Sequence, residues 1–221
     1  MWRRIYEGLQ AHFPAFSVDD WWGVTDSFAR MAGSILVQNT AWTHAKRALE
    51  ELERAGLLEP EALTHAAPDY VANLIRPAGF QQAKSAALIR LSQWVLEKGG
   101  LDALLSGTES ADELRQELLQ IKGIGPETAD TILAYALKRP AISGDAYSRR
   151  LYERLTGESL SYEQIRRAML NEFHQVEELQ RLHGLVVEHG KEICQKRNPR
   201  CGICLFASHC NRLSCDPYSF I

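Results

Sequence analysis

Helical spacing of apolar residues, repeated in segment after segment, is the feature that most limits how this chain can fold. Between residues 26 and 56, apolar side chains recur at intervals of three and four, as at Phe28, Met31 and Ile35. Further segments of about 8 to 20 residues follow, each ended by a Gly- or Pro-containing turn such as RPAGF, EKGG or KGIGP. No stretch alternates apolar and polar residues convincingly enough to predict a strand. The pattern therefore predicts an all-α protein of short, packed helices.

Length and composition set the class of protein. With 221 residues, of which 45% are hydrophobic and 24% charged, the chain is expected to form one large or two small folded, soluble domains. No apolar run approaches the ~18 residues that span a bilayer, and the stretch MWRRIYEGLQ lacks the apolar core of a secretory signal. We therefore expect a cytoplasmic protein.

Net charge leaves nucleic-acid binding open. The formal net charge is −3 and the pI is about 6.2, values that at face value argue against a polyanionic partner. A local basic patch can still bind phosphate, however, whatever the net charge of the whole chain. Basic residues do gather in two places, namely Arg149, Arg150 and Arg154, then Lys191, Lys196, Arg197 and Arg200.

All five cysteines fall between residues 194 and 215, and four of them share the stretch CQKRNPRCGICLFASHC. These four are Cys194, Cys201, Cys204 and Cys210. Such clustering indicates a metal site in a reducing compartment rather than a disulfide framework. Thiolates suit either zinc, which commonly uses two C-x2-C-like pairs, or a [4Fe–4S] cluster, which fits one compact loop. Only one such pair is present, and Cys215 is left as a spare thiol.

The stretch IKGIGPETAD, residues 121–130, predicts a tight turn between two helices. Gly123 can take a positive φ at little steric cost, and Pro126 suits the first turn of the following helix. The amide groups around Gly123 and Gly125 would then point outward from a helix N-terminus, where unpaired donors and the helix dipole favour an anion. Such a helix–hairpin–helix suits a DNA backbone phosphate and reads no bases. An ordinary helix–helix turn is the alternative.

Three cations, Lys196, Arg197 and Arg200, lie within the cysteine loop. A rigid, metal-bound loop that presents three cations would make a phosphate-contacting element. A solvated loop face is the alternative, and the neighbouring hairpin favours the interpretation as a DNA contact.

Asp145 follows the second hairpin glycine by 20 residues and precedes a helical stretch, where it would make an N-cap. A hairpin, an aspartate at this distance and a four-cysteine loop together resemble the endonuclease III superfamily of helix–hairpin–helix (HhH-GPD) DNA glycosylases, from about Asp26 to Cys210. The resemblance implies a two-lobed all-α fold and favours a [4Fe–4S] cluster over zinc. One lobe would be a six-helix domain, 23–134, that leads into the hairpin at about 113–137. The other would combine 1–22 with 135–221 and carry Asp145 and the cluster loop 194–210.

By this resemblance Asp145 is the essential carboxylate, which stabilises the oxocarbenium character that develops on the sugar or helps to activate water. Bifunctional members carry a lysine two residues after the second hairpin glycine, and its amine forms a Schiff base that permits strand cleavage. Glu127 occupies that position here, and Lys122 lies before the glycines and does not match. The resemblance therefore implies a monofunctional glycosylase.

The segment DDWWGVTDSFARMAGSILVQNTAW resembles the 3-methyladenine glycosylase branch of the superfamily. Carried over, Trp21, Trp22 and Trp42 would line the pocket for the flipped base, although Trp22 could equally be a core aromatic. A cationic alkylated purine is attracted to aromatic faces and is already a good leaving group. Ser34 stands where mismatch-specific adenine glycosylases carry a catalytic Glu, which argues against adenine. Lys191 is a further pocket candidate, because some members of the branch carry a modified lysine in a similar context. Those members lack the cluster, however, so the match is incomplete.

The remaining site residues are expected to contact DNA. Gln38 would fill the gap left by the flipped nucleotide and Phe80 would wedge into the opposite strand, which offsets a flipping cost of a few kcal/mol. A helix-capping Gln38 and a core Phe80 are the alternatives. The full set of predicted DNA contacts is Gln38, Asn39, Phe80, Lys84, Gly123, Gly125, Lys196, Arg197 and Arg200. No chemistry is assigned to His44, His183 or His189.

The sequence thus predicts a base-excision-repair enzyme that removes an alkylated purine such as 3-methyladenine from double-stranded DNA. We expect a monomer, associated with the nucleoid if the source is prokaryotic. An alternative substrate is an oxidised pyrimidine, or thymine or uracil opposite guanine. A lesion-binding protein without catalysis, or a cluster-based redox sensor on DNA, would have no need of Asp145.

Overall fold

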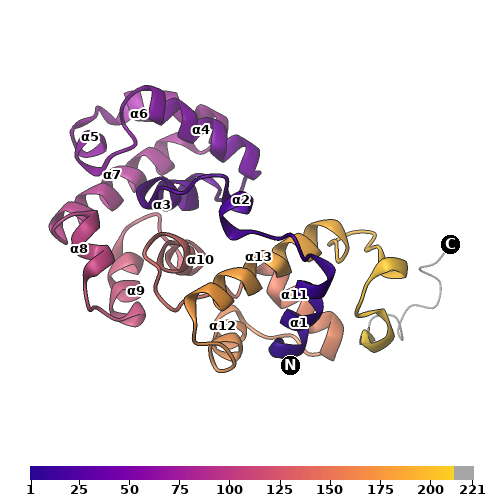
Figure 1. Cartoon of the computed structure of the whole chain (residues 1–221). Coiled ribbons are helices and arrows are strands. Elements are labelled where there is room, and N and C mark those ends of the chain that lie inside the picture. Colours follow the sequence, from indigo (N-terminus) through magenta and orange to yellow (C-terminus); the bar gives the residue numbers. More distant parts are fainter. Residues whose placement is uncertain (212–221) are drawn as a thin grey trace. The chain divides into compact units, whose positions relative to one another are not determined.

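The computed structural model describes residues 1–211, and their regular structure is entirely helical (Figure 1). The predicted all-α fold is confirmed, and no strand occurs in this range. Within the same range no helix is long and apolar enough to cross a membrane. Cys215 lies outside the described residues. The chain divides into two compact units, Met1–Trp21 with Ile142–Ile221, and Trp22–Ala141.

The unit Trp22–Ala141 is a stack of short helices in which α7 is the longest. Its helices are α3 (Ser27–Leu36), α4 (Trp42–Arg54), α5 (Pro60–His65), α6 (Pro68–Leu74), η1 (Arg76–Ala78), α7 (Gln81–Glu97), α8 (Leu101–Ser106), α9 (Ala111–Gln120), α10 (Pro126–Thr131) and the π-helical turn η2 (Ile132–Ala136). Helices α5 and α6 pack on α7, and α3 packs on α4 and on η2. This arrangement places the turn after α3 and the turn after η1 in the same unit as the hairpin.

The hairpin forms as its sequence predicts. Helix α9 begins at a capping box made by Ser110 and Glu113 and ends at Gln120. Gly123 has φ +105°, and Pro126 opens α10 directly after Gly125. The two helices are tied together by Arg115, whose Nε lies 2.8 Å and Nη2 3.1 Å from the two carboxylate oxygens of the buried Asp130. A bidentate pair of this kind fixes the geometry of the turn between its helices.

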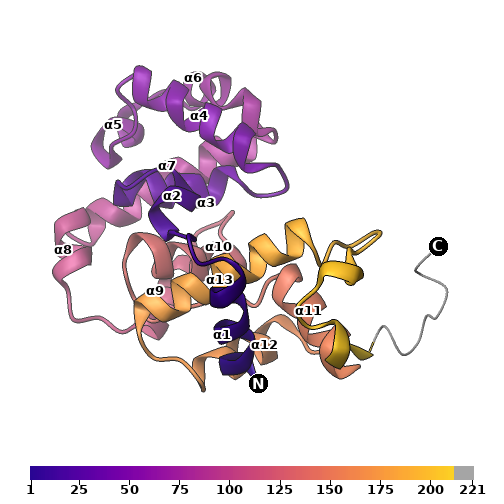
Figure 2. The ribbon, with the colours of Figure 1, turned by 45° about the vertical axis from the view of Figure 1, so that its right-hand side comes forward.

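The other unit has a core of its own. Its helices are α1 (Trp2–His12), α11 (Ala146–Thr156), α12 (Tyr162–Leu170) and α13 (Val176–Glu192), followed by the 3-10 turns η3 (Cys201–Ile203) and η4 (Ala207–His209). The short helix α2 (Val18–Trp22) spans the boundary between the units. Helix α13 packs on α1 and on α11, and both views of the ribbon show these three helices together (Figures 1 and 2). Their core includes Trp2, Leu9, Phe173 and Leu182.

Candidate active site

Asp145 caps the N-terminus of α11, as its sequence context predicts. Its Oδ1 accepts a hydrogen bond of 2.8 Å from the backbone N–H of Ser148. The residue is only 5% exposed. A buried carboxylate needs partners of this kind, because burial alone disfavours its charged form.

The second partner of Asp145 is His183, which comes from α13. Its Nε2 lies 3.3 Å from Oδ2 of Asp145, and both side chains are buried. Because an ionised carboxylate only accepts hydrogen bonds, Nε2 carries the proton in this contact. Burial raises the pKa of Asp145, but the hydrogen bond and charge of His183, together with Ser148, outweigh it and hold the pKa below its ordinary value. The site therefore keeps a buried carboxylate in its charged form.

Gly144 fixes where Asp145 lies. A Cβ at this position would come 2.3 Å from the backbone oxygen of Tyr162 and 3.1 Å from the backbone nitrogen of Arg166, both in α12. Only glycine lets the segment before α11 pass this close to another backbone. The start of α12 therefore holds the backbone immediately before the carboxylate.

Trp21 and Lys191 meet on a carboxylate that the sequence did not single out. Glu188 Oε1 accepts a hydrogen bond of 2.7 Å from Trp21 Nε1 and one of 2.8 Å from Lys191 Nζ. The ammonium also lies 5.6 Å from the centre of the Trp21 ring, and Trp21 stands edge-on to His183 at 6.1 Å between ring centres. Within this unit, contacts therefore run from Lys191 through Trp21 and His183 to Asp145.

Trp22 and Trp42 form an edge-to-face pair in the unit Trp22–Ala141. Their ring centres are 5.0 Å apart at an interplanar angle of 80°, and Trp22 also packs at 5.3 Å on Tyr135. Trp22 is buried, which is the arrangement expected of a core aromatic, whereas Trp42 is half-buried. The pair packs on Gly33, where an added Cβ would lie 3.1 Å from Trp42 and 3.3 Å from Trp22.

The turn after α3 is tied to the hairpin through Gln38. Its Nε2 donates 3.1 Å to the carbonyl oxygen of Gly123 and 2.9 Å to Oγ1 of Thr128. Gly123 and Gly125 are exposed, and Glu127 is an exposed residue in the first turn of α10. Hydrogen bonds from the Gln38 side chain thus connect the turn after α3 directly to the predicted phosphate-binding turn.

Asn39 and Phe80 stand in unusual backbone conformations. Both are non-glycine residues with left-handed φ, 55° for Asn39 and 49° for Phe80. Phe80 is 68% exposed, which excludes the alternative that it belongs to the core. For a bulky residue such as Phe80 a left-handed φ is an outlier, and such outliers cluster at functional sites.

Lys84 does not lie on the surface, and the predicted direct contact with DNA is contradicted. The residue is only 3% exposed, and its Nζ donates to the carbonyl oxygens of Leu36, Gln38 and Ala78 at 2.8, 2.9 and 2.8 Å. These three bonds use every donor that an ammonium has. Burial lowers the pKa of Lys84. The ammonium therefore binds carbonyl groups of two turns of the chain and is not available to a phosphate.

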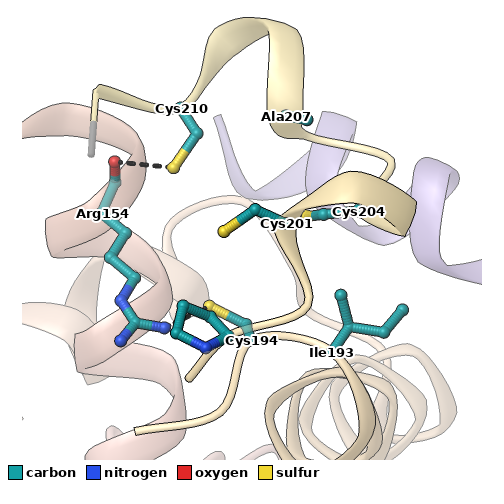
Figure 3. Close-up of a pocket in the computed structure, with 8 residues that line it drawn as sticks. Arg154, Ile193, Cys194, Cys201, Cys204, Ala207 and Cys210 are labelled. Carbon is teal, nitrogen blue, oxygen red and sulfur yellow. Dashed lines mark hydrogen bonds between the residues drawn. The ribbon is translucent and has the colours of Figure 1, made fainter. Parts of the chain in front are cut away.

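The four cysteines Cys194, Cys201, Cys204 and Cys210 line one small cavity, together with Arg154, Ile193, Pro199 and Ala207 (Figure 3). None of the four forms a disulfide. Arg154 Nη1 lies 3.1 Å from Cys194 Sγ, and Cys210 Sγ donates 3.2 Å to the carbonyl oxygen of Arg154. Burial raises the pKa of the Cys204 thiol. Among residues 1–211, no group of three or more His, Cys, Asp or Glu side chains is close enough to hold a single metal ion.

Two arginines of α11 fix the backbone of the cysteine loop. Arg150 Nε donates 2.9 Å to the carbonyl oxygen of Cys194, and Arg154 Nη1 donates 2.9 Å to that of Gln195. These two members of the basic cluster are therefore used internally. The exposed cations of the loop are Lys196, Arg197 and Arg200.

The chain matches a family of DNA repair proteins and several individual relatives. The family described as HhH-GPD superfamily base excision DNA repair protein matches residues 32–175. A candidate DNA repair glycosylase of Methanocaldococcus jannaschii is 33% identical over 197 residues, which cover 87% of this chain and 90% of the relative. Endonuclease III of Thermotoga maritima is 27% identical over 186 residues, which cover 84% of this chain and 83% of the relative.

Solved structures agree with these matches. The 3-methyladenine DNA glycosylase of H. pylori, bound to 1,N6-ethenoadenine, aligns with a TM-score of 0.74 at 25% identity, covering 86% of this chain and 96% of that one. A non-covalent endonuclease III–DNA complex shares the fold, with a TM-score of 0.79 at 18% identity over 97% and 96% of the two chains. The family and the relatives together define a DNA glycosylase of base excision repair. The chain belongs to the HhH-GPD superfamily, as its motifs predict.

Proposed function

We propose that this glycosylase is monofunctional, that it hydrolyses the N-glycosidic bond of an alkylated purine such as 3-methyladenine, and that it leaves the strand intact. One feature of the hairpin supports the monofunctional assignment: by resemblance to the superfamily motif, Glu127 occupies the position at which bifunctional members carry a lysine. A carboxylate cannot form a Schiff base with the sugar, so release of the base must end with water. An abasic site would be the product.

Asp145 supplies the charge that the reaction needs. Breaking the N-glycosidic bond develops positive charge on the sugar, and a preorganised carboxylate stabilises that charge most strongly where water is excluded. His183 and the amide of Ser148 hold the carboxylate ionised and in one orientation. The same carboxylate can orient the attacking water.

The preference for a cationic purine is supported by the aromatic residues and by Ser34. Trp21 and Trp42 are half-buried and offer faces on which a cationic base gains cation–π attraction, about 0.5 to 2 kcal/mol per face. Ser34 is buried and its Oγ donates 2.7 Å to the carbonyl oxygen of Arg30, so it has no acidic proton for a leaving base. An alkylated purine that is already cationic does not need one. The H. pylori relative, bound to ethenoadenine, supports the same class of substrate.

DNA would be held by four elements. The backbone amides around Gly123 and Gly125 would bind a phosphate at the start of α10. Gln38 would fill the gap left by the flipped nucleotide, with Asn39 as a neighbouring DNA contact, and the exposed ring of Phe80 would enter the opposite strand. The exposed cations of the cysteine loop, Lys196, Arg197 and Arg200, would add phosphate contacts whose strength falls with salt.

The cysteine loop fits a [4Fe–4S] cluster better than it fits zinc. A single zinc ion holds its sulfur ligands at about 2.3 Å, which would bring four thiolates close together. The four cysteines share one cavity, and only one C-x2-C pair is present among them. A cluster takes each cysteine on a different iron, which spaces the sulfurs more widely. The charge of Arg154 beside Cys194 suits a thiolate ligand.

Metal analysis tests the cluster. Protein purified without air or chelators is expected to contain iron and acid-labile sulfide in equal amounts, and Cys201→Ser should lose both while Ser208→Ala, in the same loop, keeps them. Because metal sites of this kind couple to folding, loss of the cluster should also lower the melting temperature. Zinc without iron or sulfide would contradict the proposal.

A panel of duplexes, each with one lesion, tests the substrate. Purified protein is incubated with duplexes that carry 3-methyladenine, ethenoadenine, an oxidised pyrimidine, or thymine or uracil opposite guanine, and alkali then cleaves abasic sites. Alkylated purines are expected to be released fastest. Thymine or uracil is the second candidate, because a thymine-DNA glycosylase of Aeropyrum pernix is 27% identical over 137 residues. Faster release of any other base would refute the substrate assignment, though not the reaction.

Restoring the missing amine is expected to restore strand cleavage. Glu127→Lys places a lysine in the first turn of α10 at an exposed position, so the fold should tolerate it. Borohydride should then trap a covalent complex with the damaged duplex that the wild-type protein does not form. Lys122→Arg in this background is the control. Trapping should persist in the double variant, because the lysine introduced at position 127, and not Lys122, is expected to attack the sugar. Absence of trapping in Glu127→Lys would show that residue 127 does not face the sugar.

The pH profile should reveal the contact with His183. The pKa of Asp145 is depressed below its ordinary value of 3.8, so the charged form persists down through mildly acid pH and is lost only as pH falls below that value. In His183→Asn the contribution of the histidine that lowers the pKa of Asp145 is removed, so burial should raise this pKa. Activity should then be lost at a higher pH, as the pH falls, than in the wild type. His65→Asn, an exposed histidine of α5, is the control and should leave the profile unchanged. Identical acid limbs in His183→Asn and wild type would exclude this role.

A further inference from the structure

Lys84 is a buried lysine without a carboxylate partner in the described part of the chain. Its Nζ instead makes three hydrogen bonds of 2.8 to 2.9 Å, all to backbone carbonyl oxygens. A lysine is almost never buried unless its charge is compensated, and here three carbonyl dipoles do so. The position of the ammonium is consequently fixed from three sides.

The three acceptors belong to two separate turns. Leu36 is the last residue of α3 and Gln38 lies two residues further on, whereas Ala78 is the last residue of η1. Carbonyl groups at the C-terminal end of a helix lack intrahelical partners and carry partial negative charge, so a cation stabilises them. One ammonium therefore caps the C-terminal ends of both helices and connects them.

The joined turns carry two residues with left-handed φ that are proposed to contact DNA. Asn39 directly follows the Gln38 carbonyl and has φ 55°, and Phe80 lies two residues after the Ala78 carbonyl with φ 49°. For a bulky residue such as Phe80 this conformation is unfavourable and persists only where its surroundings hold it, whereas asparagine tolerates it better. The amide of Lys84 also donates 3.0 Å to the carbonyl oxygen of Phe80. Lys84 thus contacts both turns through its side chain and one of them through its backbone.

We infer that Lys84 is a positioning residue for base flipping, which sets the distance between Gln38 and Phe80 so that both enter the duplex together. The inference rests on the proposed roles of these two residues. Flipping costs a few kcal/mol of unpairing and unstacking. Two inserted side chains offset that cost fully only if they are held at the spacing of the two strands, and a misplacement of about 1 Å can cost 100-fold in rate. Lys84 provides that rigidity without touching DNA.

A comparison of paired and unpaired lesions tests this role. Lys84→Met removes the three hydrogen bonds and should slow single-turnover excision from a fully paired duplex on the order of 10- to 100-fold. On the same lesion opposite an abasic site, where flipping costs little, the loss should shrink to a few-fold at most. An equal loss on both duplexes would overturn the inference, because it would show a merely structural role.

Ser85→Ala is the matched control. Ser85 is the next residue of α7, is equally buried, and its Oγ donates 2.8 Å to the carbonyl oxygen of Pro68, which belongs to neither turn. Its loss should lower the melting temperature without distinguishing the two duplexes. If Lys84→Met does not fold, Lys84→Gln, which keeps two donors, should show the same discrimination between duplexes to a smaller degree.

A mutant cycle separates failure of the inference from failure of the proposed function. With Gln38→Ala and Phe80→Ala already present, Lys84→Met should add little to the loss of excision from paired duplex. A full additional loss would overturn the positioning role alone. If Gln38→Ala and Phe80→Ala leave excision from paired duplex unchanged, the proposed roles of the two residues fail, and the inference fails with them.

Discussion

Asp145→Asn is expected to reduce base release by at least about 100- to 1,000-fold, the range found when one preorganised charge-stabilising group is removed. The amide keeps the shape of the carboxylate and caps a helix about as well, so α11 should still begin at Ala146. It cannot, however, carry the negative charge that the developing oxocarbenium requires. Single-turnover excision from the preferred duplex measures the loss.

Binding provides the control for this variant. Affinity for the damaged duplex should change little in Asp145→Asn, because the phosphate contacts lie elsewhere on the chain. Ser148→Ala, next to the carboxylate, keeps the backbone amide that Asp145 accepts from and should retain most of its activity. Undiminished excision by Asp145→Asn would remove Asp145 from the reaction. A protein that bound lesions and released no base from any of them would instead be a binding protein.

Gly144→Ala is expected to have the second largest effect. The new Cβ would lie 2.3 Å from the Tyr162 backbone oxygen, a distance that real contacts do not reach, so the backbone on one side must move. Overpacking of this kind costs about 1 to 3 kcal/mol of unfolding free energy. Because Asp145 is the next residue, its carboxylate should shift against His183 and the rate of excision should fall with it. Chemical denaturation and single-turnover kinetics measure the two effects.

Ser106→Ala, at an exposed position at the end of α8, is the control, because it lies outside every proposed site. It should change neither stability nor rate appreciably. If Gly144→Ala kept full activity, the close approach of α12 would not be what holds Asp145 in place.

The fold could be predicted because its determinants are local. Apolar residues spaced by three and four specify the helices, and Gly123, Gly125 and Pro126 specify the hairpin through the backbone conformations that these residues allow. Asp145 was expected as an N-cap for the same reason, and the structure confirms this conformation. Its role in the reaction stays a prediction.

The partners of these residues could not be predicted, because they depend on contacts between distant segments. His183 lies 38 residues from Asp145, and no short-range pattern marks it. Lys84 was predicted to contact DNA, and nothing in the sequence indicates that three carbonyl groups converge on it. Glu188, which joins Trp21 to Lys191, was missed because a single acid on a helix ordinarily faces solvent.

The central claim is that this enzyme removes a base and leaves the strand uncut. The direct measurement incubates wild-type protein with its best damaged duplex and compares strand cleavage with and without alkali, alongside borohydride trapping. Cleavage that appears only after alkali, with no trapped complex, is the result predicted from Glu127. Cleavage without alkali, together with a covalent complex trapped on the wild-type chain, would contradict the claim.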